Sequence, residues 1–243
     1  MTTKKDMLSR RRFLKGATIA GAAALLPCRL LVPGGAEAAK QEIVRRFFRY
    51  SCEYASGQAD TETVRRVEAL MEENRVRPEN RPTVVPAREA AVKAEQSAGK
   101  GHEGAFVGAS LQLADGSIAI GRNSPLMHAA SSLVINSIKQ LAGIPRQLEL
   151  LGDNIISSVA NLKKEILDRQ SISLDVGEVL VALSIGGTTN PTARLALEQL
   201  PKLRGCEAHM THIPTPGDER GLRSLGVNLT SDPVFASDRL FVA

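Results

Sequence analysis

The sequence predicts an α/β fold, a layered mixed sheet with flanking helices, preceded by a small helical subdomain. Apolar residues within 41–98 recur with a helical period, and a glycine-rich joint at 99–104 ends this part. Two apolar runs then flank Asp115-Gly116, which is typical of a β-hairpin. The rest of the chain alternates between helix and strand patterns without an internal repeat, and this order predicts the layered sheet.

The part before the joint is predicted to hold three helices. The first covers 41–55. Asp60 can cap the second, because a side-chain carboxylate accepts hydrogen bonds from the free N–H groups of a helix start. The apolar residues of this second helix fall on one stripe: Val64, Val67, Leu70 and Met71. Pro86 is placed to begin a third helix over 87–96.

The part after the joint, residues 105–243, is predicted to contain both strands and helices. The expected strands lie at 105–113, 117–121, 206–211 and 227–230, with a candidate edge strand at 239–242. The expected helices lie at 126–142, 155–167, 176–185, 190–203 and 217–225. Asp175 and Glu178 form a capping box before one helix, and Asn190-Pro191 begins another.

The first 38 residues are predicted to be a twin-arginine signal peptide. Ser9–Lys15 reads S-R-R-x-F-L-K around Arg10 and Arg11, and a short apolar stretch follows at 16–26. Small residues in Ala36-Glu37-Ala38 suit cleavage after Ala38. We therefore divide the chain into a signal peptide at 1–38, a helical subdomain at 41–98 and an α/β domain at 105–243, and we expect export through the twin-arginine translocation machinery to the periplasm or the extracellular space.

Charge and composition argue against nucleic acid and against a stable membrane anchor. The formal net charge is +5, and residues 1–38 hold seven of the 31 basic groups and two of the 26 acidic groups, which leaves 24 of each sign. The chain has no Trp, and its two tyrosines are Tyr50 and Tyr54. A part of near-neutral net charge, with neither a basic stripe nor a stacking platform, argues against nucleic acid as a partner. The apolar stretch is shorter than the ~20 residues that span a bilayer, so no stable membrane anchor is expected.

Four uninterrupted strings stand out in the mature chain. They are AFVGASLQL at 105–113, NSPLMHAASS at 123–132, TTNP at 188–191 and GCEAHMTHIPTPGD at 205–218. They resemble the C-terminal part of the bacterial domain-of-unknown-function family 1846, over a region from about Gln41 to Ala243. Members of that family are usually about twice as long and unexported, so any activity that needs their N-terminal half is in doubt here.

The resemblance implies no function, because that family is itself uncharacterised. Some members carry the label of ATP-dependent peptidase. This chain has no G-x-x-x-x-G-K-[ST] loop for a nucleotide phosphate and no H-E-x-x-H for a peptidase zinc, so neither part of that label has support in the sequence.

A second likeness concerns fold alone. The hairpin and the helix entered through His128 are similar to the start of a cytidine-deaminase-like domain, and Thr215–Asp218 falls where that fold places Pro-Cys-x-x-Cys. Zinc deaminases need three metal ligands and a glutamate that shuttles protons. Here Ala130 stands in place of the glutamate and both late cysteines are missing, so this resemblance implies a dismantled deaminase site.

Polar residues gather at the predicted ends of strands and at one helix start. In open α/β sheets, ligands bind outside such strand ends. We therefore expect a pocket for a small anionic or nucleotide-like ligand. Its candidate residues are Arg122, Asn123, His128, Thr188, Thr189, Asn190, Thr211, His212, Thr215 and Asp218.

Other chemistry has less support in the sequence. Cys206, His209 and His212 are spaced like metal ligands, but His209 points to the opposite face of an extended strand, so no metal site is expected. No cofactor and no catalytic residue is identified. Two alternatives to the ligand-binding hypothesis stay open at this point: a truncated relative that binds a partner protein without chemistry, and a hydrolase-like enzyme.

Overall fold

The computed structural model describes residues 35–169 and 171–236. The described residues from 37 onward group into one compact unit. The twin-arginine motif and the candidate edge strand at 239–242 lie outside the described residues. The division into a helical subdomain and an α/β domain stays a prediction.

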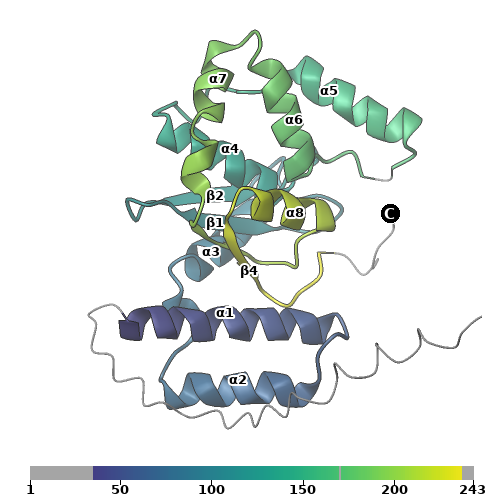
Figure 1. Ribbon diagram of the computed structural model, residues 1–243. Coiled ribbons are helices and arrows are strands. Elements are labelled where there is room, and N and C mark those ends of the chain that lie inside the picture. The colour runs from purple at the N-terminus through teal and green to yellow at the C-terminus, as the bar shows by residue number, and fades with distance from the viewer. Residues whose placement is uncertain (1–34, 170, 237–243) are drawn as a thin grey trace, which may run out of the picture. The chain divides into compact units, whose positions relative to one another are not determined.

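A mixed four-stranded sheet forms the centre of the compact unit, in the order β2-β1-β3-β4 (Figure 1). The strands are β1 (Gly108–Gln112), β2 (Ile118–Arg122), β3 (Glu207–Met210) and β4 (Asn228–Ser231). β1 pairs antiparallel with both β2 and β3, whereas β3 and β4 run parallel. The predicted hairpin is present, and in its turn Asp115 accepts a hydrogen bond from Ser117 N at 2.9 Å. The α/β prediction with a mixed sheet is confirmed.

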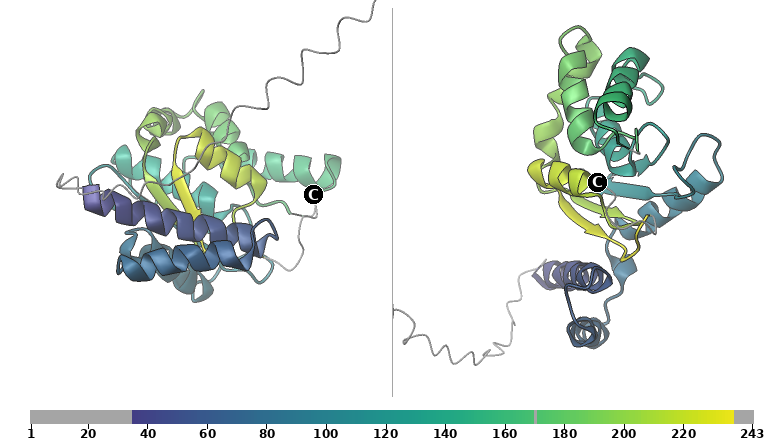
Figure 2. Two further views of the ribbon diagram at one scale, coloured as in Figure 1. Left: turned by 60° about the horizontal axis from the view of Figure 1, so that its bottom comes forward. Right: turned by 90° about the vertical axis from the view of Figure 1, so that its right-hand side faces the viewer.

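Helices lie on both faces of this sheet (Figures 1 and 2). Those on one side are α1 (Gly35–Ala55), α2 (Thr61–Glu73) and α3 (Val84–Glu95). Those on the other side are α4 (Ala129–Leu141), α5 (Asp153–Asn161), α6 (Val176–Gly186), α7 (Pro191–Leu197) and α8 (Pro216–Ser224). The sheet alone does not distinguish a cytidine-deaminase-like domain from other mixed sheets, so that likeness is not confirmed.

The predicted caps are present where the signal is local. Asp60 accepts from Thr63 N, Asp175 and Glu178 form a reciprocal box, and Asn190 accepts from two N–H groups of α7. Some boundaries were wrong. Helix α3 begins three residues before the predicted start, since the first turn of a helix needs no donors and tolerates Pro86. The expected helix at 190–203 ends at Leu197, and a short 3₁₀ turn around Pro201 follows.

One face of the sheet is apolar. Ala109 and Leu111 of β1 and Ala208 and Met210 of β3 belong to a large core with α4, α6 and α8. Contact is so close that a Cβ at Gly121 would lie 2.2 Å from Ala129 O of α4. A glycine is therefore required where α4 crosses β2.

The opposite face of the sheet is polar. Ser110 Oγ donates to Thr83 O at 2.5 Å, and His209 Nδ1 lies 2.9 Å from Thr230 Oγ1. Ser110, His209 and Thr83 are all fully buried. Helix α3 covers the β1 end, where a Cβ at Gly108 would meet Ala87 O at 2.1 Å. Because side chains alternate along each strand, one sheet presents an apolar face to α4 and a hydrogen-bonding face to α1 and α3.

Arg81 is a fully buried cation on this polar face. Its Nη1 lies 2.6 Å from Glu207 Oε2, and its Nη2 donates to Ala208 O at 3.0 Å and Asn228 O at 2.9 Å. Burial lowers the pKa of Arg81, and the carboxylate of Glu207 opposes that change. The guanidinium therefore links β3 to β4 through their backbone carbonyls.

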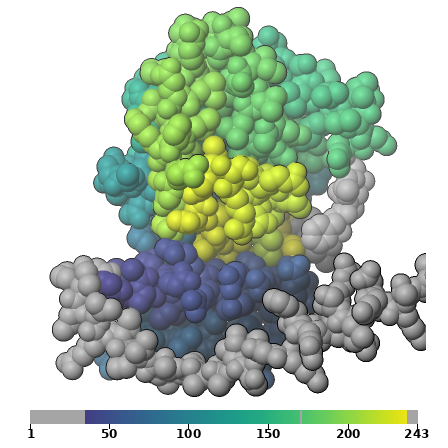
Figure 3. All heavy atoms as spheres, in the orientation of Figure 1, coloured from purple at the N-terminus to yellow at the C-terminus, as the bar shows by residue number. Residues whose placement is uncertain are grey.

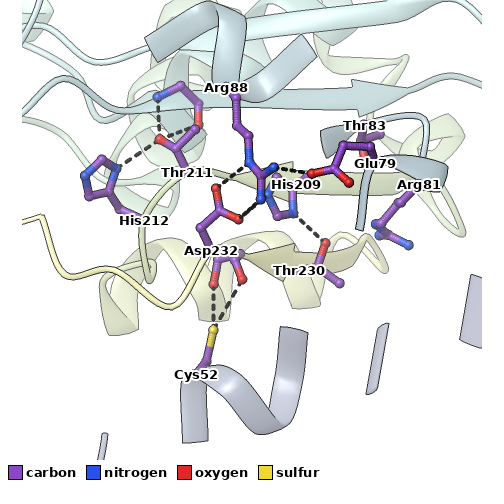
Figure 4. A network of polar contacts seen from close by, with 12 residues as sticks. Cys52, Glu79, Arg81, Thr83, Arg88, His209, Thr211, His212, Thr230 and Asp232 are labelled. Atoms are coloured by element: carbon purple, nitrogen blue, oxygen red, sulfur yellow. Dashed lines mark hydrogen bonds and ion pairs between the residues drawn. The ribbon is translucent and has the colours of Figure 1, made fainter. Parts of the chain in front are cut away.

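A second ion pair, in which Arg88 is partly exposed and Asp232 is mostly buried, lies beside it (Figure 4). Arg88 of α3 donates two hydrogen bonds to Asp232, from Nε at 3.1 Å and from Nη2 at 2.8 Å. Its Nη1 donates to Glu79. His209 Nε2 lies 3.5 Å from Asp232 Oδ1. Burial raises the pKa of Asp232, but His209 and Arg88 outweigh this and hold it at about 2. For His209, burial dominates and lowers the pKa.

Replacing Arg81 by Met should destabilise the fold by about 2–4 kcal/mol, as read from urea unfolding. Removing one partner of a buried ion pair costs about 3–5 kcal/mol. We expect a somewhat smaller loss here because the Glu207 side chain is 24% exposed. Arg66→Ala is the matched control, since Arg66 pairs with Glu62 on the exposed side of α2. That control should lose less than about 1 kcal/mol. Equal losses in both variants would show that Arg81 has no special role.

Candidate functional site

Three helix starts converge on the carboxylate of Asp218. His128, Asp175 and Thr215 are the residues that precede α4, α6 and α8. Asp218 Oδ2 accepts from Thr215 Oγ1 at 2.9 Å and lies 2.7 Å from His128 Nδ1, while Oδ1 accepts from Val176 N at 3.2 Å. Helix N-termini attract negative charge, and here the anion is the chain's own buried carboxylate. Helix α8 reaches the surface between α1 and α6 (Figure 3).

His128 is an oriented imidazole at this point of convergence. Its Nδ1 faces Asp218, and its side chain keeps 23% exposure. Burial lowers the pKa of His128, but the hydrogen bond and charge of Asp218 outweigh it, so the net pKa is raised. A histidine held by a carboxylate through one nitrogen presents the other for proton transfer. The structure thus brings together three of the predicted residues: His128, Thr215 and Asp218.

Charged residues that the sequence analysis did not assign to a site surround this centre. Lys163 Nζ donates to Ser173 O at 2.6 Å and Glu178 Oε2 at 2.7 Å, and that Glu178 oxygen also accepts from Asp175 N. A Cβ at Gly217 would lie 2.1 Å from Asp175 Oδ2, so this carboxylate rests against the start of α8. Lys163 belongs to a π-helix at Leu162–Ile166, which no sequence pattern indicated.

The pair Thr211 and His212 follows β3 but does not reach His128 through any hydrogen bond of the described residues. Thr211 Oγ1 lies 2.9 Å from His212 Nδ1 and accepts from Gly108 N at 3.0 Å. Burial lowers the pKa of His212. Thr211 therefore joins β3 to the start of β1.

Four other predicted residues hold local structure. Asn123 is buried and bonds the backbone of Val107 and Ala105. Thr188 and Thr189 return hydrogen bonds to carbonyls at the end of α6, and Asn190 caps α7. The structure accordingly does not gather the ten predicted residues into one pocket.

Arg122 lies in a groove at the free edge of the sheet, which we call the β2 groove. It measures about 630 Å³ and runs along β2 between α3 and α4, with loop residues also contributing to its lining. Its lining residues are Pro86, Glu89, Ala90, Lys93, Lys100, Ile120, Arg122, Ser124, Leu126, Met127, Ser132, Ile135, Asn136, Lys139, Arg146, Glu149, Leu150, Leu151, Asp153 and Ile156.

Basic side chains outnumber acidic ones in the β2 groove, five to three. Lys93 lies 3.6 Å from Glu89, and Lys139 donates to two backbone carbonyls. The remaining three cations, Lys100, Arg122 and Arg146, form no ion pair within the described part of the chain. Sequence reasoning found Arg122 and missed the others, because the lining residues come from segments as far apart as 86 and 156.

The possible metal ligands are not assembled. Within 35–169 and 171–236, no group of three or more His, Cys, Asp or Glu side chains is placed to hold a metal ion. His209 lies on the polar face of the sheet and contacts Phe48, with the ring centroids 4.6 Å apart and the rings tilted by 51°. Cys206 instead packs into the core on the other face.

These features define an α/β protein with a mixed sheet, a buried His–Asp pair and a basic groove at the sheet edge. The chain belongs to the family described as "Domain of unknown function DUF1846, C-terminal", which it matches over residues 79–241. Residues 33–75 also match "Domain of unknown function DUF1846, N-terminal". The expectation of a C-terminal resemblance alone is corrected by this second match, since α1 and α2 belong to the N-terminal region.

The curated relatives are named only as members of an uncharacterised family. A UPF0371 protein of Clostridium botulinum (strain Langeland) is 41% identical over 205 residues, which are 84% of this chain and 40% of the relative. A second UPF0371 protein, from the strain Alaska E43, is 42% identical over the same length. The chain therefore spans about 40% of the length of these relatives.

Export is supported by a separate match. Residues 7–27 match the twin-arginine translocation pathway signal sequence, which confirms the predicted signal. No helix in the part of the chain that the structure describes is long and apolar enough to cross a bilayer.

Replacing Asp218 by Asn should lower the pKa of His128. In the wild type it should lie above the ordinary value of about 6.5. Without the carboxylate, burial and the charge of Lys163 both disfavour the imidazolium and outweigh the smaller effect of Asp175, so the pKa should fall below that value. The imidazole NMR signals across pH 5–9 give the measurement. Asp153→Asn at the start of α5 is the matched control and should leave the His128 curve in place; an unchanged curve in D218N would contradict the pairing.

Proposed function

We propose that the protein is an exported binding protein whose β2 groove takes a small anionic or nucleotide-like ligand. The observation that carries the proposal is the presence of Lys100, Arg122 and Arg146 in one groove without an acidic partner in the described residues. Cations that lack an internal counter-ion favour an external anion. A groove of about 630 Å³ also lies within the size range of small-molecule sites.

The position of the groove supports the same proposal. Arg122 ends β2, and Ser124, Leu126 and Met127 of the following loop line the groove. This agrees with the expectation that ligands bind beyond strand ends, although an edge strand and not the sheet centre provides the surface.

Acid–base chemistry at His128 is a second candidate function, favoured by the His128–Asp218 pair. The extended segment before α4 carries Met127, which lines the groove, next to His128, which faces Asp218. Since neighbouring side chains of an extended segment point in opposite directions, this centre is separate from the groove. A ligand that shifts the His128 NMR signals without needing Arg122 would support the second candidate instead.

Inorganic phosphate and glucose 6-phosphate should bind the purified protein, and Arg122→Ala should weaken binding about tenfold. One charge-assisted hydrogen bond contributes about 1.5–3 kcal/mol, and 1.4 kcal/mol is a factor of ten. Titration calorimetry measures the affinity. Binding should also weaken as salt is raised.

Arg65→Ala is the control for this experiment. Arg65 is exposed on α2, far along the chain from the groove residues, and its loss changes the net charge by the same amount. It should bind both phosphates like the wild type. If neither phosphate binds, or if both variants bind equally, the anionic-ligand proposal is wrong and partner binding becomes the better account.

We also propose that the mature protein works outside the cytoplasm. Replacing Arg10 and Arg11 together by Lys should keep the protein in the cytoplasm, because the twin-arginine pair is the address that the machinery reads. Cell fractionation followed by immunoblotting gives the measurement. Lys4→Arg with Lys5→Arg, which conserves charge outside the motif, should be exported normally. Unchanged export of the double-lysine variant would overturn the assignment.

A further inference from the structure

The β2 groove has two chemically different parts. Cations gather where α3 ends: Lys93 lies in the last turn of α3, and Lys100 follows it in the chain. Arg122 Nη1 lies 3.5 Å from Ser97 Oγ, and Ser97 Oγ itself donates to Lys93 O at 2.5 Å. These contacts place the guanidinium beside the end of α3, so the basic part of the groove is a defined corner.

The other part of the groove is an apolar wall. Ile135 of α4, Leu150, Leu151 and Ile156 form it, with Leu126 and Met127 from the loop after β2. Leu150, Leu151 and Ile156 are almost completely buried in the main core and support the wall, so its accessible surface comes from Leu126, Met127 and Ile135. Leu126 keeps 45% exposure and is open to contact from the groove.

Lys139 holds the loop that leads into this wall. Its Nζ donates to Arg146 O and to Leu148 O, both at 2.6 Å. Burial lowers the pKa of Lys139. Because this ammonium already donates to two carbonyls, it stabilises the loop. Lys100 and Arg122 are therefore the cations that can bind the anionic group of a ligand. This loop is thus held before a ligand binds, which reduces the entropy lost on binding.

A small hydrophilic anion uses only half of this surface. Phosphate at the basic corner leaves the exposed surface of Leu126, Met127 and Ile135 in water, whereas an attached hydrocarbon chain covers it. Resting on the proposed function, we infer that the ligand class is an amphiphilic anion, with a phosphate or carboxylate head at Lys100 and Arg122 and an alkyl chain along the apolar wall. A buried methylene contributes about 0.8 kcal/mol, so each added CH₂ should raise affinity by about two- to fourfold until the wall is covered.

The test compares four probes on the full chain by titration calorimetry, below the micelle concentration of each. The probes are inorganic phosphate, butyl phosphate, octyl phosphate and octanol. Octyl phosphate should bind at least about tenfold more tightly than inorganic phosphate, and octanol should bind more weakly than octyl phosphate. Arg122→Ala should weaken both phosphates by the same factor, since the head is shared.

Leu126→Ser isolates the contribution of the ligand's alkyl chain. This exposed residue can be changed without opening the core, and it should reduce octyl phosphate binding by about fivefold while phosphate binding stays as in the wild type. Leu70→Ser is the matched control, because Leu70 is 42% exposed on α2 and outside the groove. It should leave all four affinities unchanged.

The other outcomes contradict the amphiphilic ligand, the anionic-ligand function, or both. If phosphate binding needs Arg122 but an alkyl chain adds no affinity, the amphiphilic-ligand inference is wrong and the proposed function still holds. Absence of binding for every probe overturns both. Octanol binding as tight as octyl phosphate removes the role of the anionic head. Binding to phosphatidylglycerol vesicles without binding of monomeric octyl phosphate shows a membrane surface as the partner, and also overturns the inference.

Discussion

The Arg81 guanidinium is completely buried on a sheet whose opposite face is packed with aliphatic side chains. An unpaired cation in that position would cost several kcal/mol, so the surrounding structure must supply acceptors. Glu207 and the carbonyls of Ala208 and Asn228 do so, and all three belong to β3 or β4. The need to pair this charge therefore fixes the place of the segment before α3 against β3 and β4, whose spacing their own backbone hydrogen bonds set.

Contacts to the same polar face also position α3 and α1. Arg88 ties α3 to Asp232 directly after β4, and Phe48 of α1 contacts His209. With 3% aromatic residues the chain has few large rings to fill an interface, and here hydrogen bonds and ion pairs take that place. The apolar face then carries the helices that position His128 and Asp218, while the edge of the sheet carries the β2 groove. Both candidate sites depend on a sheet that polar contacts hold from one side.

Much of the fold could be predicted because its signals are local. Asp60, the Asp175–Glu178 box and the Asp115-Gly116 turn act within four residues, and the structure has all three. The candidate site was only partly predictable. His128, Thr215 and Asp218 were found since they start helices after strands, but the groove joins α3, β2, α4 and a loop near residue 150. Such an assembly depends on tertiary packing, for which periodicity and capping residues carry no signal. The π-helix around Lys163 is unpredictable for the same reason, because its tie to Glu178 crosses 15 positions.

The boundary between the two family regions lies between residues 75 and 79, and the buried charges are distributed unevenly across it. Both strong pairs, Arg81 with Glu207 and Arg88 with Asp232, lie wholly in the C-terminal region. From the N-terminal region, α1 adds Arg45 to Glu207 at 3.2 Å and the Phe48 ring above His209. The C-terminal region therefore supplies Glu207 and the two carbonyls that pair with Arg81, and α1 supplies an aromatic cover and one extra ion pair.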